Sequence, residues 1–167
     1  MDALIRRVAH TLRDRRETVA TAESCTGGWL AKCLTDLPGS SHWFLAGWVV
    51  YSNAAKQREL GVAHTVLTRQ GAVSAATVEA LARGALRRSG ATYAIAISGI
   101  AGPGGAVPGK PVGTVCFAFA RRRGRGVHLE TLERRFRGDR DTVRRKAVET
   151  ALRGLYSMAK SSTLYIA

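Results

Sequence analysis

The sequence predicts an α/β protein, a three-layer α/β/α sandwich around a mixed, mostly parallel sheet, formed as a single domain over residues 1–167. Short β-prone apolar runs alternate with amphipathic helical stretches along most of the chain, as expected for such a fold. Residues 92–98 are almost continuously small and apolar, which suits a central strand buried on both faces. Gly124 and Gly126 separate the last two strand-like runs and predict an antiparallel hairpin.

The individual elements follow from local patterns. Helices are expected over residues 2–16, 29–36, 54–60, 65–70, 75–89 and 142–158. Strands are expected over residues 18–22, 43–51, 92–98, 113–120 and 127–136. Ser52 or Asn53 is expected to cap the third helix, Ser74 the fifth, and Asp139 or Asp141 the last. The residues after the last helix are expected to fray.

The net charge of +14 comes mainly from arginine, because only five of the 26 basic residues are lysine. The arginines cluster at residues 121–125 and 134–145. One interpretation is binding of nucleic acid or another polyanion, and the other is a solvated basic surface with a small anionic substrate. The clusters contain few aromatic residues and match no nucleic-acid-binding module, so we expect no nucleic-acid partner.

The cysteines and histidines limit the compartment and the chemistry. Three scattered cysteines are typical of a reduced, cytoplasmic protein. Four widely separated histidines show no spacing of a metal site, so we expect no metal. No apolar run reaches about 18 residues, and the first residues lack the apolar core of a signal peptide, so we expect no membrane span or signal peptide.

Residues 21–28, Thr-Ala-Glu-Ser-Cys-Thr-Gly-Gly, lie where the first strand is expected to run into a helix. The N-terminus of a helix has unpaired N–H groups and a positive dipole, and glycine lets an anion approach the backbone. Gly27 and Gly28 could therefore admit a phosphate or a developing oxyanion, beside Ser24 as a nucleophile. The alternatives are that Ser24 or Thr26 only caps the helix and that Cys25 is the nucleophile.

Two further segments are expected to join Ser24 along one rim of the sheet, at the ends of the second and third strands: residues 51–53 and 98–104. A serine nucleophile needs a base, and these segments contain no histidine. Lys56 is the candidate base, because desolvation lowers the pKa of lysine, although a lone lysine is more often solvated. Tyr51 could relay a proton or orient the substrate, and Glu23 could act as an acid or base or pair with an arginine.

The glycine-rich loop at residues 98–105 could hold a phosphate or ribose with its backbone N–H groups. It lacks the spacings of a P-loop or a dinucleotide-binding fingerprint, and it could equally be a tight connection between buried strands. Arg140 is expected at the start of the last helix, where it could bind an anionic group.

Several segments, taken together, resemble the CinA C-terminal-domain family, and they occur in the same order over about residues 5–155. They are residues 21–28, 51–53 with Lys56, 71–74, 98–105, 110–115 and 138–140. The chain looks like the stand-alone nicotinamide-nucleotide amidohydrolase form of that family. The resemblance implies hydrolysis of the carboxamide of nicotinamide mononucleotide to nicotinic acid mononucleotide and ammonia. It also implies a Ser24–Lys56 mechanism assisted by Tyr51, a homo-oligomer, and no metal or cofactor.

The residues proposed to contact this pyridine nucleotide come from all three rim segments and the last helix. They are Cys25, Thr26, Gly27, Gly28, Asn53, Ser98, Gly99, Gly102 and Arg140. The chain departs from the family at residues 106–109, where relatives more often carry a polar or acidic stretch, and this could alter substrate preference. Two other functions stay open: a non-catalytic nucleotide-binding module of the same family and a polyanion-binding protein.

Overall fold

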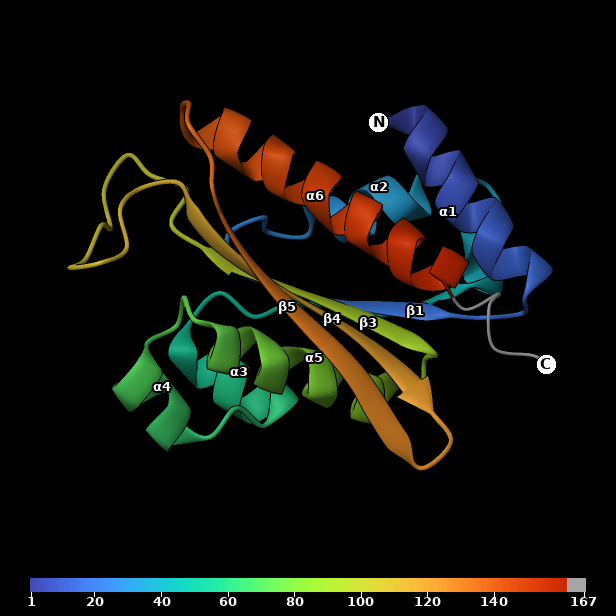
Figure 1. Ribbon diagram of the computed structural model, residues 1–167, viewed down its shortest axis with the longest axis horizontal. Helices are drawn as coiled ribbons and strands as arrows, with labels where there is room; N and C mark the ends of the chain where they lie inside the picture. The colour runs from blue at the N-terminus through green and yellow to red at the C-terminus, as the bar shows by residue number, and fades with distance from the viewer. Residues whose placement is uncertain (162–167) are drawn as a thin grey trace.

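A computed structural model describes residues 1–161 and shows one five-stranded sheet in the order β2-β1-β3-β4-β5 (Figure 1). The strands are β1 (Val19–Glu23), β2 (Phe44–Val49), β3 (Tyr93–Gly99), β4 (Thr114–Arg123) and β5 (Gly126–Arg135). β1 pairs in parallel with both β2 and β3, whereas β3, β4 and β5 pair antiparallel. The predicted mixed sheet is therefore confirmed, with its antiparallel part at the end of the chain.

Helices cover both faces of the sheet (Figure 1). They are α1 (Asp2–Asp14), α2 (Trp29–Thr35), α3 (Asn53–Leu60), α4 (His64–Gln70), α5 (Ala75–Ser89) and α6 (Arg140–Ser161), with a 3₁₀ turn at Ser40–His42. α1, α2 and α6 lie on one face, and α3, α4 and α5 lie on the other. Each helical layer encloses its own apolar cluster, one around Leu12 and Leu152 and one around Leu81. The predicted three-layer sandwich is confirmed.

Every expected helix and strand is present, with ends that differ by a few residues. Ser52, and not Asn53, caps α3, because its Oγ accepts from the Ala55 N–H (3.1 Å). Asp139, and not Asp141, caps α6, because its Oδ1 accepts from the Thr142 N–H (2.8 Å). Ser74 caps α5 as predicted. α6 is longer than predicted at both ends. The fraying expected for the last residues concerns residues 162–167, which lie outside the described residues.

The carboxyl ends of β1, β2 and β3 meet at one rim, as predicted from parallel pairing. Glu23 lies beside Val49 on β2 and Ile97 on β3. The Ser24 N–H continues the pairing by donating to the Ile97 carbonyl (3.0 Å), and the Val50 N–H donates to the Glu23 carbonyl (2.8 Å). The sheet itself therefore fixes Ser24 between the ends of its two neighbours. Within residues 1–161, no helix has the length and apolar character needed to cross a membrane.

Candidate active site

Glu23, the last residue of β1, organises the start of α2. Its side chain is fully buried. The carboxylate accepts hydrogen bonds from the N–H groups of Gly28 (3.1 Å), Leu30 (3.0 Å) and Ala31 (2.8 Å). A negative charge at this position complements the helix dipole and satisfies N–H groups that the helix leaves unpaired. Glu23 thus acts as an internal helix cap, and a substrate anion would compete with it for the Gly28 N–H.

Ser24 and Lys56 meet directly in the structure. Lys56 lies in the first turn of α3, and its Nζ is 3.1 Å from Ser24 Oγ. Lys56 is only 1 % exposed and Ser24 is 8 % exposed. Ser24 does not cap α2, since Gly28 is the residue at the cap position of that helix and Glu23 supplies the carboxylate. The structure therefore brings together the two residues that sequence reasoning proposed as nucleophile and base.

The surroundings of Lys56 disfavour its positive charge. Nζ donates to the carbonyl oxygens of Val50 (2.8 Å) and Tyr51 (2.9 Å), and within residues 1–161 no carboxylate forms an ion pair with it. Burial lowers the pKa of Lys56 from its ordinary value, although the nearby Cys25 acts in the opposite direction. Desolvation without a compensating negative charge is the usual way in which a lysine becomes a base near neutral pH.

Cys25, the rival nucleophile, is buried, and burial raises the pKa of its thiol to about 12. Its own backbone N–H and the more distant Arg144 and Arg140 act against that rise, but they do not overcome it. A thiol with such a pKa stays protonated at neutral pH and is a poor nucleophile. The burial of this thiol thus favours Ser24 over Cys25 as the candidate nucleophile, an alternative that the sequence alone left open.

The turn after Ser24 is held from two sides. The Gly27 N–H donates to the Ser24 carbonyl (3.1 Å), and both Gly27 and Gly28 have positive φ (63° and 91°), which favours glycine. Arg144 on α6 donates to the carbonyls of Cys25 (Nε, 3.1 Å) and Thr26 (Nη2, 2.9 Å). Thr26 is fully buried, and its hydroxyl has no hydrogen-bond partner among the described residues.

Arg140 connects the other parts of the rim. Its Nη1 donates to the Gly102 carbonyl (2.8 Å), and its Nη2 donates to the Tyr51 hydroxyl (2.9 Å). The Tyr51 side chain is 58 % exposed, and its backbone carbonyl contacts Lys56. Asn53 is exposed at the start of α3. Arg140 and Tyr51 therefore form an exposed polar edge near the Ser24–Lys56 pair, beside the buried Gly102, and within residues 1–161 the Asn53 side chain forms no hydrogen bond to this edge.

Ser98 and Gly99 have structural contacts at the end of β3. The Ser98 hydroxyl is buried and donates to the Ala72 carbonyl (2.7 Å). A Cβ on Gly99 would lie 2.7 Å from a methyl group of Val115, so only glycine fits beside β4. These observations favour the tight connection between buried strands at this end of the loop. The loop can still approach a ligand beyond it, where Gly102 contacts Arg140.

Sequence reasoning missed two features of the site. Arg144 is one of many arginines between residues 134 and 145, and nothing in its local sequence distinguishes it from Arg145. The carbonyls of Val50 and Tyr51, which accept hydrogen bonds from Lys56, belong to the backbone. Their role therefore could not be predicted from the types of these two residues. A helix register that directs Arg144 toward the sheet could have suggested its contact, because α6 buries Ala147 and Val148 one turn further on.

The fold and the site define a class: α/β/α proteins with a buried serine–lysine pair at the carboxyl rim of a mixed sheet. The chain matches the sequence model described as the CinA C-terminal domain over residues 1–159. It belongs to this family, which confirms the resemblance seen in its motifs.

Relatives and solved structures agree with this assignment. The chain is 51 % identical to the nicotinamide-nucleotide amidohydrolase PncC of Escherichia coli K12, over 96 % of this chain and 95 % of that protein. It is 50 % identical to the protein of the same name in Pseudomonas putida, over 93 % and 94 %. A CinA superfamily structure from Klebsiella pneumoniae superposes with a TM-score of 0.90 at 40 % identity, covering 96 % of this chain and 98 % of the other. The two PncC relatives are named as enzymes.

Proposed function

We propose that this protein hydrolyses the carboxamide of nicotinamide mononucleotide to nicotinic acid mononucleotide and ammonia, with Ser24 as nucleophile and Lys56 as general base. The observation that carries the mechanism is the buried contact between Lys56 Nζ and Ser24 Oγ (3.1 Å). The substrate class comes from the two relatives that are 51 % and 50 % identical to this chain. Their names specify amide hydrolysis of a nicotinamide nucleotide.

The three contacts of Lys56 support its role as a base. A neutral amine has two N–H bonds and one lone pair. The carbonyls of Val50 and Tyr51 accept the two N–H bonds, which leaves the lone pair to face Ser24 Oγ. In that state the Ser24 O–H donates to Lys56, as required for proton removal during attack. After proton transfer, the ammonium form keeps all three contacts, so no side chain has to move.

The reaction proceeds in two halves. Ser24 Oγ attacks the carboxamide carbon while its proton passes to Lys56 Nζ, and the C–N bond then breaks as Lys56 returns the proton to the departing ammonia. Water next attacks the acylated Ser24, with Lys56 taking one of its protons and giving it to Ser24 as the ester bond breaks. The products are the nicotinic acid nucleotide and ammonia, and the enzyme is regenerated without a metal or cofactor in any step.

The exposed polar edge supplies the groups proposed to bind the nucleotide. Arg140 offers a guanidinium to the 5′-phosphate, and the Tyr51 hydroxyl lies 2.9 Å from that guanidinium, so both could contact one substrate. Gly102 lies beside them, and Asn53 and the turn at Gly27 border the same rim. A cytoplasmic location, predicted from the cysteine content, and a homo-oligomeric state, implied by the family resemblance, remain predictions.

The test is ammonia release from nicotinamide mononucleotide by the wild type and by Ser24→Ala. We expect turnover by the wild type and a loss of at least about 10³-fold in the folded variant, since the acyl-enzyme cannot form. Absence of turnover by the wild type, together with tight binding of the nucleotide, would instead identify a non-catalytic binding module. Undiminished turnover by Ser24→Ala would refute the proposed nucleophile.

A further inference from the structure

Arg144 reaches from α6 to the turn that follows Ser24. Its Nε and Nη2 donate to two successive carbonyls, those of Cys25 (3.1 Å) and Thr26 (2.9 Å). The guanidinium carbon also lies 5.3 Å from the centre of the Trp29 ring, on the face of the indole. Two hydrogen bonds and a ring contact hold the guanidinium in one orientation, so it can in turn hold the two peptide groups.

The geometry of the peptide bond transmits this orientation to the opposite side of the turn. In a trans peptide, the C=O and the N–H of the next residue lie in one plane and point in opposite directions. The Thr26 carbonyl points to Arg144, and the Gly27 N–H on the other side of that peptide donates to the Ser24 carbonyl (3.1 Å). By the same rule, the Cys25 carbonyl bound to Arg144 directs the Thr26 N–H away from the guanidinium.

Two N–H groups of this turn bind the protein itself, and the N–H of Thr26 is buried. The Gly27 N–H donates to Ser24, and the Gly28 N–H donates to Glu23. The Thr26 N–H donates no hydrogen bond to another group within residues 1–161. Because Thr26 is fully buried, the contacts of Arg144 act on the shape of the turn that carries Ser24 and not on a group that meets the substrate.

We propose that Arg144 is a positioning residue for the reaction: by binding the Cys25 and Thr26 carbonyls, it fixes the turn that carries Ser24 and keeps Ser24 Oγ against Lys56 Nζ. This inference rests on the proposed function, because it assumes attack by Ser24. Arg144 itself touches no reacting atom.

Arg122 provides a matched control at the far end of the sheet. It uses the same two nitrogens, with Nε 3.4 Å from the Ala91 carbonyl and Nη2 2.8 Å from the Leu86 carbonyl. Its loss removes a comparable pair of structural hydrogen bonds without touching the turn at Ser24. A purely structural role of Arg144 therefore predicts the same phenotype for both substitutions.

The experiment measures kcat, KM and the thermal midpoint for wild type, Arg144→Ala, Arg144→Lys and Arg122→Ala, with nicotinamide mononucleotide as substrate. We expect Arg144→Ala to lower kcat by about 10²-fold with KM within about threefold, because Ser24 is then held less firmly against its base. Arg144→Lys keeps a cation but not the two-pronged contact, and we expect a loss of about tenfold. Arg122→Ala should keep kcat within about twofold at a similar loss of thermal midpoint.

Different outcomes overturn different claims. A raised KM with unchanged kcat in Arg144→Ala would assign Arg144 to substrate binding, and equal effects of Arg144→Ala and Arg122→Ala would reduce it to a structural role. The Thr26 amide resonance gives a readout without turnover: it should shift in Arg144→Lys and not in Arg122→Ala, and an unmoved resonance refutes the inference. A wild type with no activity, or an active Ser24→Ala, refutes the proposed function and this inference with it.

Discussion

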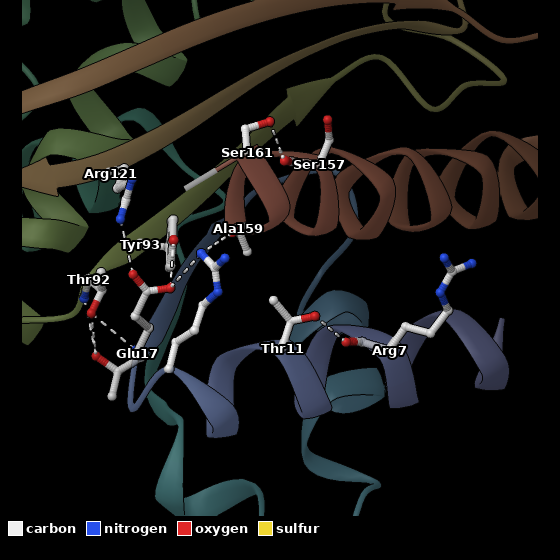
Figure 2. A network of polar contacts seen from close by, with 11 residues as sticks. Arg7, Thr11, Glu17, Thr92, Tyr93, Arg121, Ser157, Ala159 and Ser161 are labelled. Atoms are coloured by element: carbon white, nitrogen blue, oxygen red, sulfur yellow. Dashed lines mark hydrogen bonds and ion pairs between the residues drawn. The ribbon is translucent and has the colours of Figure 1, made fainter. Parts of the chain in front are cut away.

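The two ends of β1 carry polar clusters of opposite character, one partly buried and one fully buried. Before the strand, the Glu17 carboxylate accepts from the Tyr93 hydroxyl (2.8 Å) and from Arg121 Nη2 (3.1 Å), and Arg15 Nη1 lies 4.0 Å away (Figure 2). After the strand, Lys56 is buried more completely, and it contacts a serine hydroxyl and two backbone carbonyls. One end compensates its charges with opposite charges, and the other surrounds a cation with neutral dipoles.

The difference indicates which cluster stabilises the fold and which can do chemistry. A buried charge with an opposite partner keeps its ionised form and joins the elements that carry it. At the Glu17 end, the side chains link β3, β4 and the segment that follows α1. A buried lysine without a carboxylate is easily deprotonated, because burial lowers its pKa and only a weaker contribution from Cys25 acts in the other direction. The three predictions that follow test this contrast.

The largest effect is expected for Lys56→Met, which keeps the length of the side chain but removes the amine. We expect ammonia release to fall by at least about 10³-fold, since Ser24 loses its base. We expect the free energy of unfolding to change by no more than about 2 kcal/mol, because removing a desolvated amine offsets the loss of its hydrogen bonds to the carbonyls of Val50 and Tyr51. Steady-state kinetics and urea unfolding at pH 7 measure both. A large loss of stability would mean that Lys56 is mainly structural.

The pH dependence of the same pair of proteins gives the control. The pKa of Lys56 is below 10.5 in the folded protein, while in the unfolded chain it has its ordinary value of 10.5. Between these two values the unfolded chain binds one more proton, so the wild-type free energy of unfolding gains a contribution that rises with pH. The difference between wild type and Lys56→Met should therefore increase in favour of wild type toward pH 10.5. A flat difference would contradict the lowered pKa.

A medium effect is expected from neutralising one carboxylate at each end of β1. Glu17→Gln should lower the free energy of unfolding by about 2 kcal/mol, because it leaves Arg121 without its ionic partner, while kcat stays within about twofold. Glu23→Gln should cost a similar amount, since the amide offers only one oxygen to three N–H groups. It should also lower kcat by about tenfold, because the turn carrying Ser24 depends on those bonds. Equal kcat values in the two variants would contradict the proposed division of roles.

The fold could be predicted almost completely from the sequence, because the spacing of apolar residues and the glycines at turns determine local secondary structure. The convergence of Ser24 and Lys56 also followed, since parallel strands bring their carboxyl ends to one rim. The role of Glu23 did not follow, because a carboxylate that accepts three backbone N–H bonds depends on the exact path of the turn after it. The contact of Arg144 could not be predicted either. It joins residues 118 or 119 positions apart, and its acceptors are backbone carbonyls, which do not depend on the type of side chain.

The smallest effect is expected for Cys25→Ala, which tests the boundary between the two candidate nucleophiles. Burial raises the pKa of the Cys25 thiol to about 12, so almost none of it is thiolate at neutral pH. We expect kcat to change by no more than about threefold, with a stability loss of about 1 kcal/mol from the vacated space. Iodoacetamide at pH 8 should leave the folded wild type active, because the side chain is also only 5 % exposed. Two results together would identify Cys25, and not Ser24, as the nucleophile. One is that iodoacetamide inactivates the enzyme and nicotinamide mononucleotide protects against this inactivation. The other is a large loss of kcat in Cys25→Ala.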